Sequence, residues 1–404
     1  MRRRAAGAVL AALLTASACT APADPAATPT AREIAAVLED RAAAVLEHDA
    51  AGYLAALDPG ATELRTAQRG ELANLADVPL KSWTYELKGV TERDGGRATA
   101  DVELRYRIAG YDTAPAAARR TLELTRDGGR WHITADRAAE GAAGQLWQQG
   151  DVEVVEGAHS IVLGVERPAG ELRQVADAVD LAVPAVSDAW PRPWTRRVVV
   201  LVPGSVRDMA ALLGAPEAGY RGIAAVTTGE VGGTGRRPAL ADRVIVNPQA
   251  YADLGGFGQR VVLTHETTHV ATRTSTSTAT PVWLSEGFAD WAAYRGEDRS
   301  AASIAPELAA ALRTGEVPAE LPGDRDFGFD GDPAKLGRAY EGGWLACALI
   351  AERWGREKLV AFYESVGAHP RREGAVEQAM DAVLGTTLEQ FTADWRDYLG
   401  ARLG

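Results

Sequence analysis

The segment His265-Glu266-Thr267-Thr268-His269 decides how the second half of this chain is expected to fold. Residues four apart lie on one face of a helix, so both imidazoles can reach one metal ion. Glu266 lies one position further round the helix, where it flanks a metal-bound water. Helical apolar spacing surrounds the segment from Gly258 to Thr272. The pattern therefore predicts a helix that carries a hydrolytic metal site.

A third metal ligand is predicted from Trp283-Leu284-Ser285-Glu286-Gly287-Phe288-Ala289-Asp290, in which Glu286 follows His269 after sixteen intervening residues. Catalytic zinc sites use three protein ligands and one water, and two histidines with a glutamate form one of the recurring sets. We therefore expect Zn²⁺ on His265, His269 and Glu286, with Glu266 as the general base. With 6 histidines in 404 residues, a chance match has a probability of about one in a hundred or less.

Together the two segments resemble the gluzincin metallopeptidases, the group that includes thermolysin and the aminopeptidase N type. The resemblance covers roughly residues 195–366 and is most specific at Ser285–Ala289, which matches the S-E-G-F-A form of that family's second zinc-binding helix. It implies a zinc metallopeptidase that hydrolyses peptide bonds. The gluzincin-like domain is expected to occupy residues 151–404, with a small sheet followed by a mostly helical part.

The same resemblance suggests roles for two more residues. Asp290 matches the acidic residue that orients a zinc-binding histidine in the thermolysin branch, and a solvated surface aspartate is the competing interpretation. Tyr340, in Ala339-Tyr340-Glu341-Gly342-Gly343-Trp344, matches the tyrosine that stabilises the oxyanion in the aminopeptidase branch, and a core aromatic is the alternative. The G-x-M-E-N segment that binds a substrate amine in that branch is absent, so the choice between endopeptidase and exopeptidase stays open.

Periodicity predicts secondary structure throughout the rest of this second region. Strands are expected at 152–155, 161–163, 197–202, 222–227 and 243–247, and helices at 171–190, 258–272, 282–294, 301–314, 334–353, 357–365 and 388–399. Because strands come first and helices follow, the domain is predicted to be α+β.

The first region, residues 31–137, has a different pattern. Helical spacing from Ala31 to about Asp58 and a short helix at 63–75 precede strand-like alternation, and the repeated Arg-Asp-Gly-Gly-Arg segments at 93–97 and 126–130 predict hairpin turns. This order resembles the nuclear transport factor 2-like, cystatin-like α+β cone. We expect it to be an accessory module rather than a second active site.

The N-terminus predicts export. Residues 1–19 combine three arginines, a short apolar run and small residues before Cys19, as in a signal peptide. Cys19 resembles the lipidated cysteine of a bacterial lipobox, although ordinary signal peptidase would also accept the site. Residues 20–30 are expected to be a disordered linker. The protein would then be anchored by lipid on the outside of the cell membrane, or secreted.

Composition narrows the classes of function. At 404 residues the chain exceeds the ~250–300 at which single cores stop growing, so two domains are expected. A net charge of −12 argues against nucleic acid as a partner, leaving a peptide or protein substrate and a membrane contact through Cys19. Nothing in the sequence predicts an oligomeric state.

Two other functions fit the same sequence. One is a cell-surface binding or assembly lipoprotein with a catalytically idle peptidase-like domain, and the other is a zinc hydrolase of a non-peptide amide or ester. The intact Glu266 argues against the idle domain, because a non-catalytic site needs no base.

Overall fold

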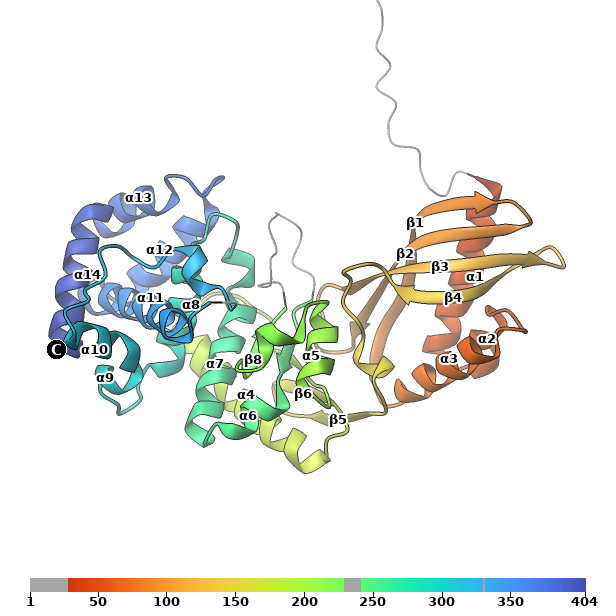
Figure 1. Cartoon of the computed structure of the whole chain (residues 1–404), viewed down its shortest axis with the longest axis horizontal. Helices are drawn as coiled ribbons and strands as arrows, with labels where there is room; N and C mark the ends of the chain where they lie inside the picture. Colours follow the sequence, from red (N-terminus) through yellow and green to blue (C-terminus); the bar gives the residue numbers. More distant parts are fainter. Residues whose placement is uncertain (1–27, 229–240, 330) are drawn as a thin grey trace, which may run out of the picture.

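A computed structural model describes residues 28–228, 241–329 and 331–404 (Figure 1). The predicted signal peptide, the predicted lipidation site at Cys19 and most of the predicted 20–30 linker lie outside these residues. The structure is mixed α/β and compatible with the predicted α+β class. None of the helices formed by the described residues is both long and apolar enough to cross a membrane.

The N-terminal part is an antiparallel sheet with three helices. The strands follow the order β1-β2-β3-β4, so each hairpin joins neighbouring strands. Figure 1 shows α1 lying across the sheet. The elements are α1 (Pro29–Leu46), α2 (Ala50–Ala55), α3 (Thr62–Asn74), β1 (Leu80–Arg93), β2 (Arg97–Ile108), β3 (Ala116–Asp127) and β4 (Arg130–Ala138).

Local chemistry explains where these helices begin and end. Thr28 caps α1 by accepting the N–H of Ala31 at 3.1 Å, so the helix begins inside the segment predicted to be a linker. The helical pattern from Ala31 to Asp58 is divided in two, because His48 adopts a φ of +55° and Asp49 caps α2. The predicted hairpin turns at 93–97 and 126–130 are confirmed, and both glycines of each turn have positive φ.

The second sheet has the order β5-β6-β7-β9-β8. Strands β6, β7 and β9 are parallel neighbours, whereas β5 and β8 pair antiparallel at the two edges. One face packs against α4 and α7 in a cluster that includes Val162, Val200 and Leu263. The elements are β5 (Val152–Glu156), β6 (Ser160–Val165), α4 (Ala169–Ala189), β7 (Val198–Val202), α5 (Val206–Leu213), β8 (Ala225–Thr227), β9 (Val244–Val246) and α6 (Pro248–Asp253).

The opposite face of this sheet shares one continuous apolar core with the N-terminal sheet. Leu163 and Leu201 belong to the same buried cluster as Trp83 and Leu122. A buried ion pair also joins the two sheets, since Arg243 donates to both carboxylate oxygens of Asp112 at 2.8 and 2.7 Å. The two sheets therefore support each other through both apolar packing and a paired charge.

Helices form the rest of the chain, as predicted from the pattern after Gly258. The expected helix at 301–314 is two helices, because Pro306 cannot continue the first one and starts the second. The elements are α7 (Gly256–Thr272), α8 (Val282–Tyr294), α9 (Ala301–Ile304), α10 (Pro306–Arg313), α11 (Pro333–Trp354), α12 (Arg356–Ala368), α13 (Ala375–Ala379) and α14 (Leu388–Leu403).

Helices α8 and α11 cross in direct backbone contact. A Cβ atom added at Gly287 would lie 2.2 Å from the carbonyl oxygen of Gly343, and one added at Gly343 would lie 2.6 Å from the carbonyl oxygen of Trp283. Neither position can hold a larger residue without moving a helix. Because Glu286 precedes Gly287, this contact also sets the position of a predicted metal ligand.

We predict that Gly287→Ala lowers the free energy of unfolding by about 2 kcal/mol or more, because the methyl group must push α8 away from α11. Gly400→Ala is the matched control. Gly400 is exposed on α14, and an added Cβ would meet nothing within 4 Å. That variant should be neutral or more stable by up to about 1 kcal/mol. Thermal and urea unfolding measure both changes, and equal stability of the two variants would contradict the prediction.

Candidate metal centre

Three potential ligand atoms converge from α7 and α8. The Nε2 atoms of His265 and His269 lie 2.9 Å apart, because the two residues are one helical turn from each other. The Oε2 atom of Glu286 lies 3.2 Å from the first of these nitrogens and 3.6 Å from the second. The structure thus brings together the three residues predicted as zinc ligands, and this His-His-Glu cluster could bind a metal ion.

The spacing of these atoms suits zinc. A tetrahedral zinc ion with bonds near 2.0–2.1 Å has its ligand atoms about 3.3 Å apart, which lies within the observed range of 2.9–3.6 Å. Asp290 lies one helical turn after Glu286, and its Oδ1 is 2.8 Å from Nδ1 of His265. With its proton on Nδ1, His265 would donate a hydrogen bond to the carboxylate of Asp290, and the lone pair of Nε2 would be available to bind a metal.

The imidazoles and carboxylates of the cluster shift one another's pKa values. Burial lowers the pKa of His265, but Asp290 and Glu286 raise it by more, so its pKa lies well above the ordinary value. Burial raises the pKa of Glu286, yet His269 and His265 together hold it well below the usual range. Both shifts arise because carboxylates and imidazoles share a buried space, where each stabilises the charged form of the other.

Glu266, the predicted general base, lies on α7 between the two histidines and is only 6% exposed. Its carboxylate oxygen Oε2 accepts a hydrogen bond from Oγ1 of Thr227 at 2.6 Å. Thr227 is the last residue of β8 and was not among the residues predicted to act in the site. The sequence does place it at the end of an expected strand, but its contact with a helix about forty residues later is visible only in the fold.

Tyr340 lies beside the cluster on α11. Its ring centre is 6.3 Å from that of His265 and 5.1 Å from that of Phe327. The side chain is half-buried. This placement brings the tyrosine to the site but does not by itself assign the predicted oxyanion role.

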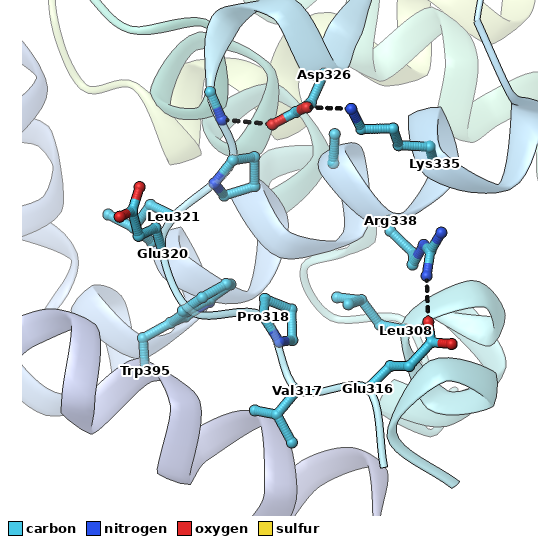
Figure 2. A pocket seen from close by; sticks show the side chains of 13 residues that line it. Leu308, Glu316, Val317, Pro318, Glu320, Leu321, Asp326, Lys335, Arg338 and Trp395 are labelled. Atoms are coloured by element: carbon cyan, nitrogen blue, oxygen red, sulfur yellow. Dashed lines mark hydrogen bonds and ion pairs between the residues drawn. The ribbon is translucent and has the colours of Figure 1, made fainter. Parts of the chain in front are cut away.

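Two hollows lie on opposite faces of α11. One of about 330 Å³ is bordered by Asp290 and Tyr340 and so adjoins the cluster. The other, of about 520 Å³, is shown in Figure 2, where Arg338 pairs with Glu316 and Lys335 pairs with Asp326. Because Lys335 and Arg338 project from the side of α11 opposite Tyr340, this second hollow is separate from the candidate metal centre.

Comparison with solved structures gives a distant likeness. No protein-family model matches the chain, and no curated protein matches it. A solved structure of an M1 zinc metallopeptidase mutant from Deinococcus radiodurans, bound to a Tyr-Ser-Ala substrate, is similar with a TM-score of 0.33 and 14% identity. The match covers 74% of this chain and 61% of that one, so this chain spans less than two thirds of the length of the protein it resembles.

We predict that Asp290→Asn weakens zinc binding by about 10- to 100-fold, because the neutral amide orients His265 less firmly and removes a negative charge. Competition with a calibrated chelator measures the dissociation constant. Asp253→Asn is the control, since Asp253 is an exposed aspartate at the end of α6. Equal zinc affinity in the two variants would show that Asp290 does not support the site.

Proposed function

We propose that this chain is a zinc-dependent metallopeptidase of the gluzincin type that hydrolyses peptide bonds outside the cytoplasm. The observation that carries the proposal is the convergence of His265, His269 and Glu286 on one point, with Glu266 on the same helix as both histidines. A zinc site that also has a buried carboxylate next to it is suited to hydrolysis.

Each residue has a distinct task in this mechanism. When bound, Zn²⁺ polarises a carbonyl group and lowers the pKa of a water molecule toward about 7. Glu266 takes the proton of the attacking water and delivers it to the leaving amine. Asp290 holds His265 in the orientation that binds metal, through the 2.8 Å contact to Nδ1. Tyr340 is proposed to donate a hydrogen bond from its hydroxyl to the oxyanion that forms as the carbonyl is attacked.

We predict that Glu266→Gln retains one zinc ion per chain but loses at least about 100-fold in peptide hydrolysis, because glutamine cannot accept the proton. Metal analysis and digestion of a peptide library, with products identified by mass spectrometry, measure the two properties. The library also distinguishes internal from terminal cleavage. Glu297→Gln, an exposed glutamate just after α8, is the control and should behave like the unchanged protein.

Three results would contradict this proposal. Purified protein without stoichiometric zinc would contradict the proposed metal site. Unchanged hydrolysis by Glu266→Gln would show that Glu266 is not the general base. Zinc-loaded protein that cleaves esters or non-peptide amides but no peptide would identify a different hydrolase.

We propose further that the protein is exported and attached to the outer side of the cell membrane through a lipid on Cys19, with secretion as the alternative. The support is the sequence alone, in which arginines, an apolar run and small residues precede Cys19. We predict a mature N-terminus at an acylated Cys19, detected by intact-mass and peptide mass spectrometry. An unmodified N-terminus near Cys19 would indicate secretion, and an intact Met1 would contradict export.

A further inference from the structure

We infer that Thr227 is a positioning residue for the hydrolysis, because its hydroxyl holds the carboxylate of Glu266 in the orientation from which it takes a proton. The inference rests on the proposed role of Glu266 as general base. It adds a residue from the edge strand β8 to a site otherwise built from helices.

The geometry assigns the donor and the acceptor. Oγ1 of Thr227 lies 2.6 Å from Oε2 of Glu266 and 3.1 Å from the backbone carbonyl oxygen of the same residue. A hydroxyl has one proton to donate, and the shorter distance is to the carboxylate. Oε2 is therefore engaged by Thr227, which leaves Oε1 for the attacking water. Thr227 is fully buried, so bulk water does not compete for the bond.

The packing of β8 aims this hydroxyl at α7. Successive strand residues point to opposite faces, and Ala225 belongs to the same apolar cluster as Leu263 of α7. Val226 points the other way, into the cluster that contains Ile245. Cross-strand pairing of Val226 with Ile245 and of Thr227 with Val244 fixes the register. A slip by one residue would turn the threonine away from Glu266.

A glutamate needs such a contact if it is to act as a base. Its terminal torsion has a broad energy profile, so the carboxylate plane is not fixed by the side chain itself. Misplacement of a reacting group by about 1 Å can cost on the order of 100-fold in rate. A buried hydrogen bond at one oxygen restricts that rotation without touching the metal ligands. Loss of the hydroxyl should therefore lower kcat and leave KM and zinc binding unchanged.

Three variants separate positioning from structural support. Thr227→Val keeps the shape and removes the hydroxyl, whereas Thr227→Ser keeps the hydroxyl. Thr268→Val is the matched control, because Thr268 is also buried, at 1% exposure, and its hydroxyl donates only to a helix carbonyl, that of Thr264 at 2.8 Å. All three variants should retain one zinc per chain and cooperative thermal unfolding.

The first readout is kinetic. With a peptide found by the library digest, Thr227→Val should lower kcat by about 10- to 100-fold with KM unchanged, the range expected for one hydrogen bond to a charged group. Thr227→Ser should recover most of this loss, and Thr268→Val should match the unchanged protein.

The second readout does not depend on peptide cleavage. Acetohydroxamic acid binds zinc through two oxygens as its anion, so its N–OH proton must pass to a neighbouring base such as the carboxylate of Glu266. Calorimetric titration of the zinc-loaded proteins should show binding at least about 10-fold weaker in Thr227→Val than in Thr227→Ser or Thr268→Val.

The two readouts distinguish failure of the inference from failure of the proposed function. If zinc-loaded protein cleaves no peptide, the peptidase proposal fails, and weaker acetohydroxamate binding by Thr227→Val would still support the positioning role. Equal kcat or equal acetohydroxamate affinity in Thr227→Val and the unchanged protein would overturn the inference. Loss of zinc or of cooperative unfolding in Thr227→Val would also overturn it, by assigning Thr227 a structural role.

Discussion

The contact between Gly287 and Gly343 is the constraint on which the candidate metal centre depends. Two glycines let the backbones of α8 and α11 touch, since a Cβ on either residue would lie within 2.6 Å of a backbone oxygen of the other helix. Each glycine weakens its helix by about 1 kcal/mol relative to alanine, a loss that only close packing can offset. The crossing fixes α8, which carries Glu286 and Asp290, relative to α11, and it brings Tyr340 of α11 beside His265. One backbone contact thus positions a proposed ligand, its neighbouring carboxylate and the candidate tyrosine.

The other side of α7 is held by the second sheet, and that sheet is held by the N-terminal one. Arg243, the residue before β9, makes a bidentate ion pair with Asp112. Its neighbour Asp242 pairs with Arg273, the residue that follows α7. Desolvation makes buried ion pairs a poor source of net stability, but breaking one by removing a single partner typically costs about 3–5 kcal/mol. These pairs therefore favour one arrangement of the sheets and α7 over its alternatives. The N-terminal part accordingly contributes to the support of the metal centre although it supplies none of its proposed ligands.

The sequence predicted what is local and missed what is distant. Helices α7, α8 and α11 are predicted by apolar residues at helical spacing. The four-residue spacing of His265 and His269 directly predicts that their two imidazoles converge. Arg41 lies in the same stripe as Leu38 and Val45, and the structure buries it completely beside Asp136 of β4. Its position was visible in the pattern, but a partner 95 residues away was not. Thr227 is the same kind of case, because the register of a three-residue edge strand against a helix is set by tertiary packing.

The charges of the centre favour a catalytic over an idle site. Glu266, Glu286 and Asp290 are all largely shielded from solvent, and the side chains that bond to them include His265, His269 and Thr227. Burying carboxylates without matching positive charge is costly, so a divalent cation at the two histidines and Glu286 would relieve the repulsion. A structural zinc site would need Glu286 as a ligand and gain from Asp290 as a support. It would need no third carboxylate, and burying Glu266 there would only add a desolvation cost. Proton transfer in the proposed hydrolysis is a task that would account for both Glu266 and the hydroxyl of Thr227 that bonds to it.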